Sequence, residues 1–354
     1  MKIGLFGLPQ SGKTTLFNAL TGSDAPVNAY TAKVEPNISI VKVLDTRIDR
    51  LSAMYTPKKT TYATLEIVDI AGVTEDALRK DTFPGEMMRV IRNVDALAIV
   101  LRGFSDDLQG EPAVLQDCRA IEEELILSDL IVLEKRLEKV VEGYKKGKKT
   151  DLAVAEEQLL RRLVDQLNNN LPIRDLEFTP SEQQILRGFQ LLTLKPVLAI
   201  LNTDEERFGK QPELLQSLQE HFTTVEFVGN FEMELSRLDA EEAQLFMQDM
   251  GITESARARL SKLAYSILGY ISFFTVGHDE VRAWNIRDGS TAVIAAGTIH
   301  SDLARGFITA ECFTCEDLLT LGSEKAVKEQ GKFHLVGKEY TVRDGDILNI
   351  RFNV

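Results

Sequence analysis

The chain has 354 residues, 44% of them hydrophobic and 27% charged, and it carries a formal net charge of −13 at pH 7. This length suffices for about two or three domains with buried cores. The net negative charge argues against a protein that coats nucleic acid, although such a chain can still carry local basic patches. No apolar run approaches the ~20 residues of a membrane helix, and Met1 leads directly into a predicted strand, so we expect no targeting peptide and a cytoplasmic protein without membrane contact.

The chain opens with the pattern of a strand, a glycine-containing loop and a helix. Residues 2–6 are an apolar run typical of a buried strand, and residues 7–14, GLPQSGKT, fit the phosphate-binding pattern G-x-x-x-x-G-K-[ST]. The two glycines let successive N–H groups turn towards phosphate oxygens, Lys13 can reach the β- and γ-phosphates, and the Thr14 hydroxyl suits a Mg²⁺ shell. A helix beginning near Lys13 presents its positive end to the same anion. The nucleotide contacts predicted here are Gln10, Ser11, Gly12, Lys13, Thr14 and Thr15.

A second part of the same site is predicted at the end of a later strand. Residues 62–68 have a strand pattern that ends at Asp69-Ile70-Ala71-Gly72. The Asp69 carboxylate can order a water on Mg²⁺, and the Gly72 N–H can lie against a γ-phosphate. An isolated Asp-x-x-Gly is more often a simple turn, but downstream of this loop we favour the functional interpretation. We therefore expect Mg²⁺ to be bound by Thr14 and, through water, by Asp69.

Strands and helices alternate over most of the chain, as in a doubly wound sheet of mostly parallel strands. The further predicted strands of this sheet cover residues 37–43, 62–68, 96–101, 195–201 and 224–228. Helical spacing recurs at residues 87–94 and 254–269. The sequence therefore predicts an α/β fold of the P-loop NTPase kind.

Residues 117–171 interrupt this alternation with two long helical patterns. Leucines recur at steps of three and four residues on both sides of the basic stretch 143–150, GYKKGKKT. Two long helices joined by a short linker indicate an antiparallel helical hairpin inserted in the fold. Its lysine-rich tip could meet RNA or another acidic surface, and it could equally be a solvated turn.

The C-terminal part of the chain has the pattern of a separate, β-rich unit with one embedded helix and no recognisable catalytic arrangement. The predicted elements are a hairpin, a helix and two further strands, at residues 272–276 with 281–286, 292–299, 306–313 and 346–354. Cys312-x-x-Cys315 lacks the further ligands of a metal site, so we favour a packed pair of strands for it. The three cysteines of the chain are too few for a disulfide framework.

These residues resemble a known family nearly end to end, the YchF or Obg-like ATPases among the translation-factor GTPases. The matching motifs are GLPQSGKTTLFNALTG at 7–22, VEPN at 34–37, DIAG at 69–72, FTVG at 274–277 and GDILNIRFNV at 345–354. The tail is the most specific of these matches, because it looks like the family's TGS domain, a β-grasp module.

The resemblance implies three domains and an activity. It implies a nucleotide-binding domain of residues 1–116 and 191–271, the inserted helical hairpin at residues 117–190, and the TGS-like β-grasp domain at residues 272–354. Family members are nucleoside triphosphatases with ribosome-linked or stress-linked roles, so the resemblance implies the same for this chain.

The resemblance also implies how the base is read. Standard GTPases carry Asn-Lys-x-Asp, whose carboxylate accepts hydrogen bonds from guanine, whereas Asn202-Thr203-Asp204-Glu205 matches the Asn-x-x-Glu of this family. The longer Glu205, with no lysine beneath the base, admits adenine, so ATP is favoured and GTP stays admissible. A Ser-Ala-Lys-type loop usually backs the base, and Gly229 and Asn230 stand in its place. The predicted contacts of this region are Asn202, Thr203, Glu205, Gly229 and Asn230.

This chain departs from the family at positions that bear on hydrolysis. Gln10 and Ser11 replace an Asn-Val pair whose Asn is expected to help hold a monovalent cation. Lys33 occupies the position of the switch threonine, and Thr31, two positions earlier, is an alternative Mg²⁺ ligand. Residues 73–82 replace the glycine-rich switch of the family. Val73 stands where Ras-like enzymes place a catalytic Gln and where family members also carry an apolar residue, so the sequence identifies no catalytic residue.

Two functions therefore stay open. The first is slow, Mg²⁺-dependent hydrolysis of ATP or GTP by a regulatory switch linked to translation or stress. The second is a hydrolysis-deficient adaptor that binds nucleotide and contacts the ribosome or RNA through the hairpin tip and the TGS-like domain.

Overall fold

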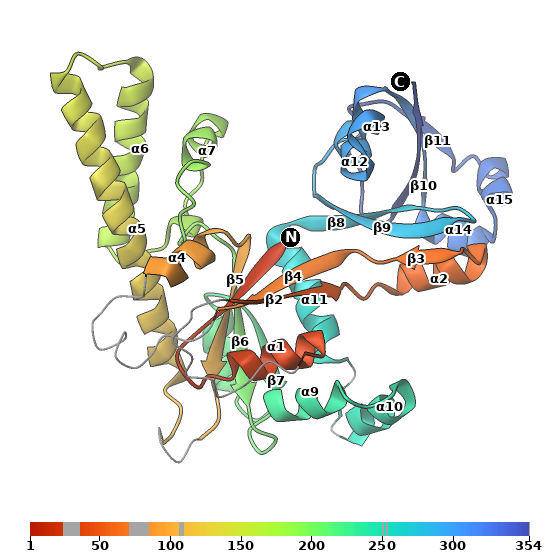
Figure 1. Cartoon of the computed structure of the whole chain (residues 1–354), viewed down its shortest axis with the longest axis horizontal. Helices are drawn as coiled ribbons and strands as arrows, with labels where there is room; N and C mark the ends of the chain where they lie inside the picture. The colour runs from red at the N-terminus through yellow and green to blue at the C-terminus, as the bar shows by residue number, and fades with distance from the viewer. Residues whose placement is uncertain (24–35, 71–84, 106–109, 250, 253, 354) are drawn as a thin grey trace. The chain divides into compact units, whose positions relative to one another are not determined.

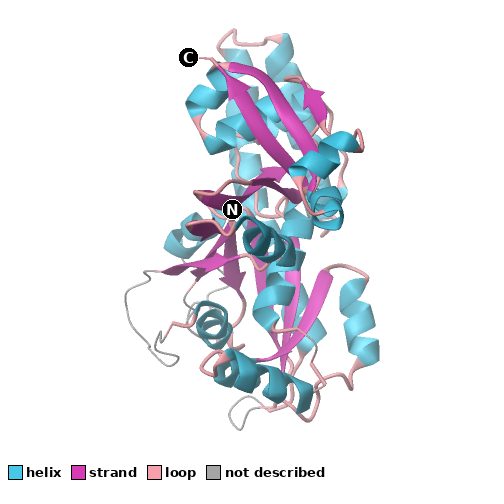
Figure 2. Cartoon of the chain, turned by 90° about the vertical axis from the view of Figure 1, so that its right-hand side faces the viewer, coloured by secondary structure: helices cyan, strands magenta, loops and turns pink. Residues whose placement is uncertain are grey.

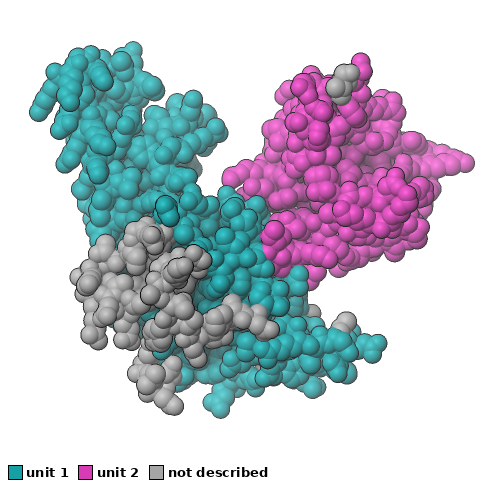
Figure 3. Space-filling view, viewed as in Figure 1, with its two compact units in different colours: residues 1–39, 66–257 teal, residues 40–65, 258–354 magenta. Residues whose placement is uncertain are grey.

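The computed structural model describes residues 1–23, 36–70, 85–105, 110–249, 251–252 and 254–353. These residues form two compact units, residues 1–39 with 66–257 and residues 40–65 with 258–354 (Figure 3). The short stretch 40–65 thus groups with the C-terminal part of the chain. The domain limits at residues 117, 191 and 272 stay predictions.

The first sheet holds six described strands, in the spatial order β2 (Asn37–Lys42), β4 (Thr64–Asp69), β1 (Lys2–Phe6), β5 (Ala96–Arg102), β6 (Val197–Thr203) and β7 (Thr223–Val228) (Figure 1). The pairs β1–β4, β1–β5, β5–β6 and β6–β7 are parallel, which confirms the predicted α/β fold. Every residue of β5 and β6 is buried, and this explains their continuous apolar sequences. Because these strands run the same way, the segments that follow β1, β4 and β6 lie at one edge of the sheet.

Helices connect the strands of this unit. They are α1 (Lys13–Thr21), α4 (Gly85–Arg92), α5 (Val114–Lys145), α6 (Asp151–Asn168), the 3₁₀ turn η1 (Ile173–Asp175), α7 (Pro180–Leu186), α8 (Pro212–Gln219), α9 (Gly229–Leu235) and α10 (Ala240–Asp249). The next helix, α11 (Ala256–Leu268), belongs to the second unit from residue 258 on. The sequence does not predict α7 to α10, because helices of 7 to 10 residues have too few turns for a clear periodicity. Within the described residues, no helix is both long and apolar enough to span a membrane.

α5 and α6 form the inserted helical hairpin that the sequence predicts (Figure 1). Leu133 on α5 and Leu160 and Leu163 on α6 are fully buried in the seam between the two helices. The connecting turn places Gly147 in the left-handed region (φ 75°), and the Thr150 side chain caps the start of α6. The apolar seam therefore holds the two helices against each other, and the tip of the hairpin stays short and polar.

A buried ion pair fixes α5 to the rest of this unit. Asp129 on α5 is fully buried, and its Oδ1 accepts a hydrogen bond from Arg92 Nη1 at 3.1 Å. Asp129 Oδ2 accepts from the N–H and the hydroxyl of Thr193 at 2.7 and 2.8 Å. Arg92 is the last residue of α4, and it also donates to the carbonyl oxygens of Ser128 and Gln190. One carboxylate thus joins α4, α5 and the segment before β6.

We expect Asp129→Ala to lower the free energy of unfolding by about 3–5 kcal/mol, because it removes the counter-ion of the largely buried Arg92 and leaves the buried N–H and hydroxyl of Thr193 without their acceptor. Urea unfolding measures this loss. The control is Glu156→Ala, which breaks the more exposed pair of Glu156 with Arg136 on the hairpin and should cost less than about 1 kcal/mol. Equal, small losses in the two variants would contradict the anchoring role of Asp129.

The second unit is built on another sheet of six described strands, in the order β11 (His334–Val336), β10 (Phe307–Thr314), β12 (Asp346–Phe352), β8 (Tyr270–Thr275), β9 (Glu280–Arg287) and β3 (Lys59–Thr61). Figure 2 draws the strands of the chain in magenta and its helices in cyan. The β12–β8 and β3–β9 pairs are parallel, and the other three are antiparallel. Ala295 and Ala296 of α12 (Ala292–Ile299) are buried with Phe273 of β8 and Leu348 of β12 in one apolar core. The predicted strands and helix are present, and the assignment of this unit as TGS-like stays a prediction.

The expectation of one helix in this unit is wrong. Besides α12, the unit holds α13 (Ser301–Arg305), α14 (Cys315–Leu321), α15 (Glu324–Glu329) and, from the stretch 40–65, α2 (Thr46–Tyr55). The short helices α14 and α15 start at side-chain caps, Thr314 and Ser323. Such caps, and not apolar periodicity, mark helices of one or two turns.

The residues 40–65 join this unit through long-range contacts. β3 pairs with β9 in parallel, Arg47 on α2 donates to Asp344 at 2.6 Å, and the Tyr55 hydroxyl donates to Glu324 at 2.6 Å. These side-chain partners are separated by 297 and 269 residues in the sequence. Local sequence patterns do not reveal such pairings.

Cys312 lies on β10 and Cys315 begins α14, and both thiols are free and buried. The interpretation as a packed pair of strands is therefore wrong for Cys315. Burial raises the pKa of Cys312 to about 12 and the pKa of Cys315 to about 11. Neither group is a reactive thiolate at neutral pH.

Candidate functional site

Residues 7–14 form the loop between β1 and α1, at the edge where the parallel strands end. Gly7 (φ 156°) and Gly12 (φ 91°) adopt backbone conformations that favour glycine, and a Cβ on Gly7 would lie 2.4 Å from the Val100 carbonyl oxygen. Gln10 also adopts the left-handed region, at φ 59°. Gly12 precedes α1 and has no side chain to cap its first turn. The N–H groups at the start of α1 can therefore bind an anion.

Lys13 lies beneath this loop and is only 5% exposed. Its Nζ donates to the Leu8 carbonyl oxygen at 2.6 Å. Burial lowers the pKa of Lys13 to about 8, and the charge of Asp69 opposes this shift. The Ser11 hydroxyl is buried as well and has no hydrogen-bond partner among the described residues. A buried cation and an unpartnered hydroxyl are groups that a phosphate could satisfy.

Asp69, the last residue of β4, lies beside the start of α1. Its Oδ2 accepts from the Thr14 hydroxyl at 3.1 Å and from Asn37 Nδ2 at 3.3 Å, while its buried Oδ1 has no partner in the described part of the chain. Burial raises the pKa of Asp69, whereas the hydrogen bonds from Asn37 and Thr14 and the charge of Lys13 lower it. A hydroxyl oxygen beside an unpartnered carboxylate oxygen fits Mg²⁺, a cation that prefers oxygen ligands. Over the same described residues, no cluster of three or more His, Cys, Asp or Glu forms a metal cage.

Asn202 in β6 connects the phosphate-binding loop to a third segment. Its Nδ2 donates to the Ser11 carbonyl oxygen at 3.0 Å, and its Oδ1 accepts from the Gly229 N–H at 3.1 Å. The fit is close, because a Cβ on Gly12 would lie 2.0 Å from Asn202 Nδ2 and a Cβ on Gly229 would lie 2.9 Å from Oδ1. A Cβ on Gly229 would also lie 3.4 Å from the Thr15 side chain. One buried amide therefore holds the loop, β6 and the start of α9 together.

The other predicted contacts around Asn202 differ in exposure. Thr203 is buried, and its hydroxyl donates to the Phe227 carbonyl oxygen of β7 at 3.3 Å. Glu205, after β6, and Asn230, in the first turn of α9, are exposed. Four residues considered from the sequence lie outside the described residues: Thr31, Lys33, Gly72 and Val73.

Comparison with known proteins identifies the family. Residues 2–146 match a family model described as "50S ribosome-binding GTPase", and residues 270–353 match YchF-GTPase_C, described as "Protein of unknown function (DUF933)". The chain is 38% identical over 363 residues to "Ribosome-binding ATPase YchF" of Bacillus subtilis (strain 168), with 99% of each chain covered. The chain belongs to the YchF family. It is also 37% identical over 363 residues to the protein of that name from Escherichia coli O157:H7, with 100% of this chain and 99% of the relative covered.

A solved structure of the YchF family is similar in fold as well. The Schizosaccharomyces pombe YchF GTPase superposes with a TM-score of 0.87 at 31% identity, over 99% of this chain and 97% of that one. The similarity extends over both compact units and so includes the C-terminal sheet.

Sequence reasoning misses Asn37 as a site residue, although it belongs to the VEPN stretch through which the chain resembles the YchF family. Its amide contacts the same Asp69 oxygen as Thr14 does. Its signals in the sequence are the VEPN stretch and its position at the start of the predicted strand 37–43, and the structure places that strand, β2, beside β4.

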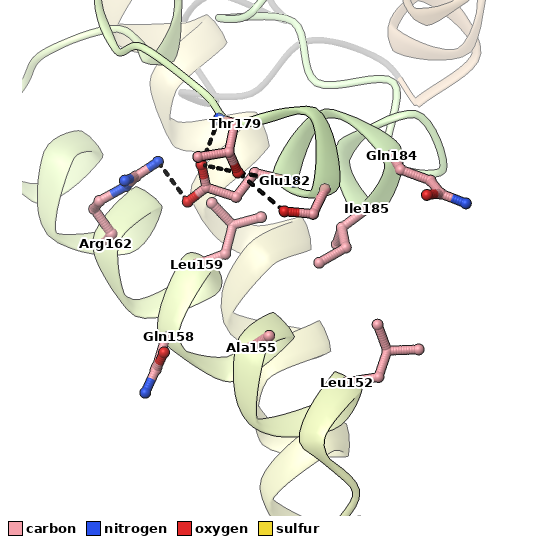
Figure 4. Close-up of a pocket in the computed structure, with 10 residues that line it drawn as sticks. Leu152, Ala155, Gln158, Leu159, Arg162, Thr179, Glu182, Gln184 and Ile185 are labelled. Atoms are coloured by element: carbon pink, nitrogen blue, oxygen red, sulfur yellow. Dashed lines mark hydrogen bonds and ion pairs between the residues drawn. The ribbon is translucent and has the colours of Figure 1, made fainter.

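A groove of about 670 Å³ lies elsewhere in this YchF-family chain, between α6 and α7 (Figure 4). Leu152, Leu159 and Ile185 line it, together with Arg162 and Glu182, which form an ion pair at 3.0 Å. None of the site residues predicted from the sequence lines this groove. It is therefore a feature of helix packing, separate from the phosphate-binding loop.

Buried Lys13 predicts a pH-dependent stability of the nucleotide-free protein. Its pKa falls to about 8 in the folded state from the ordinary value of 10.5 that applies to the unfolded chain. Between these values the unfolded chain binds more protons, so the free energy of unfolding rises with pH. Relative to Lys13→Met, we expect a gain of about 2–3 kcal/mol between pH 7 and pH 10. Urea unfolding of both proteins tests this, and an equal pH dependence in the two would contradict it.

Proposed function

We propose that this chain binds Mg²⁺–ATP at the phosphate-binding loop, accepts GTP as a weaker ligand, and hydrolyses the nucleotide slowly as a ribosome-linked regulatory switch. The observation that carries the proposal is the arrangement of Lys13, Thr14 and Asp69 at the ends of β1 and β4. It combines a buried cation, a hydroxyl and a carboxylate oxygen without a partner. A triphosphate with a divalent cation needs these groups. The names of the relatives, ribosome-binding ATPases, support the same activity.

Each group has its own task in this proposal. The N–H groups of the loop bind the β-phosphate, and Lys13 exchanges the Leu8 carbonyl oxygen for oxygens of the β- and γ-phosphates. Thr14 binds Mg²⁺ directly and Asp69 binds it through water. When bound, Mg²⁺ neutralises charge on the phosphoryl group that is transferred. The Gly72 N–H is proposed to contact the γ-phosphate.

We propose that the base lies against the segment that follows β6. Glu205 is exposed there and supplies a carboxylate that accepts from the N6 amino group of adenine. Guanine also offers N–H donors to a carboxylate, so GTP binds as well. Gly229 and Asn230 border the base from the start of α9, while Asn202 keeps this region in contact with the loop.

We propose the hairpin tip as one contact with the ribosome, and the TGS-like unit as another. Lys145, Lys146, Lys148 and Lys149 are exposed at the tip and form a local basic site in a chain with a net charge of −13. Phosphates of RNA bind such clusters of lysines.

Charge reversal of two tip lysines tests this contact. We expect Lys145→Glu combined with Lys148→Glu to weaken co-sedimentation with ribosomes by about tenfold at low salt, and the loss to shrink as salt rises. The control is Lys135→Glu combined with Lys210→Glu, two exposed lysines of the first unit that lie away from the hairpin tip. Unchanged co-sedimentation of the tip variant would remove the hairpin from the interface.

A second function is favoured by two departures from the family in the sequence. Lys33 stands at the position of the family's switch threonine, and residues 73–82 replace the family's glycine-rich switch. In this alternative the chain binds nucleotide without hydrolysing it, and the nucleotide serves to stabilise a form that contacts the ribosome.

One pair of measurements separates these functions. Titrations with labelled ATP and GTP, with and without Mg²⁺, measure binding, and single-turnover hydrolysis with and without ribosomes measures turnover. We expect tighter binding of ATP than of GTP and weaker binding after EDTA treatment. Hydrolysis above the buffer rate supports the switch, binding without hydrolysis supports the adaptor, and absence of binding rejects both.

A further inference from the structure

Arg207 ties the segment that follows β6 to the loop that follows β5. The Asp204 carboxylate accepts from the Arg207 N–H at 2.9 Å and from Arg207 Nη1 at 3.2 Å, which closes a turn shortly after Asn202. Arg207 Nη2 donates to Ser105 Oγ at 2.5 Å and to Glu111 Oε2 at 2.9 Å. A single guanidinium thus joins two loops at the same edge of the sheet.

Arg102 holds the described residues next to Ser105 and Glu111. Arg102 is the last residue of β5 and is 7% exposed. Its Nη1 donates to the carbonyl oxygens of Phe104 and Gly110 at 3.0 and 2.9 Å. Phe104 and Gly110 are the chain neighbours of Ser105 and Glu111. Arg207 therefore contacts two residues whose neighbours are bonded to the last residue of β5.

The segment after β6 has two other attachments, one at each end. Asn202 holds its start through the contacts with Ser11 and Gly229. The Gly209 N–H donates to Glu226 Oε2 of β7 at 3.1 Å and holds its end. Glu205 lies between these two points and is exposed, and its backbone belongs to the turn that Arg207 closes.

We propose that Arg207 is a positioning residue for the purine base, because its bonds to Asp204, Ser105 and Glu111 fix the turn that presents Glu205. This inference rests on the proposed function, since it concerns the base-binding end of the same site. The phosphates bind residues 10–14 in that site, so loss of Arg207 affects binding of the base and leaves binding of the phosphates unchanged.

The exposure of these side chains indicates that loss of Arg207 will change nucleotide affinity and not the stability of the fold. The Glu111 side chain is 80% exposed and that of Arg207 is 27% exposed, so their ion pair adds little to the stability of the fold. A turn that is ordered before binding, however, saves the entropy of ordering it in the complex. Arg207→Ala should therefore unfold like the wild type, within about 3 °C, and bind nucleotide more weakly.

The test compares ATP with inorganic triphosphate, which carries phosphates and no base, in calorimetric titrations of the full chain with Mg²⁺. Arg207→Ala is expected to raise the Kd for ATP about fivefold to tenfold and to leave the Kd for triphosphate and the hydrolysis rate at saturating ATP unchanged. Glu111→Ala should act in the same direction, and adding it to Arg207→Ala should cause no further loss, because both remove one interaction. Arg161→Ala removes an exposed arginine paired with Glu157 on α6 and should match the wild type.

Wild-type affinity of Arg207→Ala for ATP would overturn the role of Arg207. An equal loss of ATP and triphosphate binding would overturn it too, because the variant would then disturb the phosphate-binding loop. The proposed function fails on a different result, namely binding of both ligands by Lys13→Ala as tightly as by the wild type, and the role of Arg207 fails with it.

Discussion

Replacing Lys13 with alanine is expected to weaken binding of Mg²⁺–ATP by at least about a hundredfold and to leave the fold intact. Lys13 is 5% exposed, and its ammonium group donates to the Leu8 carbonyl oxygen of the phosphate-binding loop. Hydrogen bonds between a cation and phosphate oxygens contribute about 1.5–3 kcal/mol each, so loss of two of them explains this magnitude. Titration of purified wild type and Lys13→Ala with labelled ATP measures the effect.

The stability of the same variant separates a lost ligand contact from a lost fold. Burial disfavours the charged form of Lys13, as its lowered pKa indicates, so alanine removes an unfavourable charge from the nucleotide-free protein. We expect Lys13→Ala to unfold at no lower urea concentration than the wild type. Lys139→Ala, which removes an exposed lysine from α5, is the matched control for binding. Binding by Lys13→Ala within about threefold of the wild type would contradict the assignment of this loop.

The sequence predicts the parts of the site that depend on local pattern. The phosphate-binding loop and Asp69 each follow a short apolar strand, and parallel strands bring their ends together without any further information. The contacts of Asn202 could not be predicted in this way. The resemblance assigns it to the base, whereas its amide is bonded to Ser11 and Gly229 in the structure, and these contacts depend on how β6 and α9 meet the loop.

The sequence predicts helices that have many turns, and it misses contacts between residues that are far apart in the chain. α5 and α6 have enough turns for their leucine spacing to be recognised. β3 has three polar residues, and its partner in the sheet is β9, with Lys59 opposite Glu280. The side chains that fix α2, such as Arg47, likewise have their partners near the end of the chain. Such contacts leave no local pattern, so the placement of residues 40–65 follows only from the structure.

Gly12→Ala is expected to lower the free energy of unfolding by about 3 kcal/mol or more and to weaken ATP binding by at least about tenfold. Gly12 has φ 91°, and a Cβ there would lie 2.0 Å from Asn202 Nδ2. The side chain of Asn202 would have to leave its place, and the Ser11 carbonyl oxygen and the Gly229 N–H would lose their partner. Urea unfolding and ATP titration measure the two effects.

Gly22→Ala measures the cost of a positive φ alone, without the steric clash with Asn202 that Gly12→Ala causes. Gly22 also has a positive φ, 67°, but a Cβ there meets nothing within 4 Å. Gly22→Ala should therefore show only the strain of about 1–2 kcal/mol and bind ATP like the wild type.

The double variant Gly12→Ala with Asn202→Ala tests the clash directly, because without the Asn202 amide the new methyl group has no atom to displace. Its loss of stability should be smaller than the sum of the two single losses. Strict additivity, or equal effects of Gly12→Ala and Gly22→Ala, would mean that Asn202 does not hold the phosphate-binding loop.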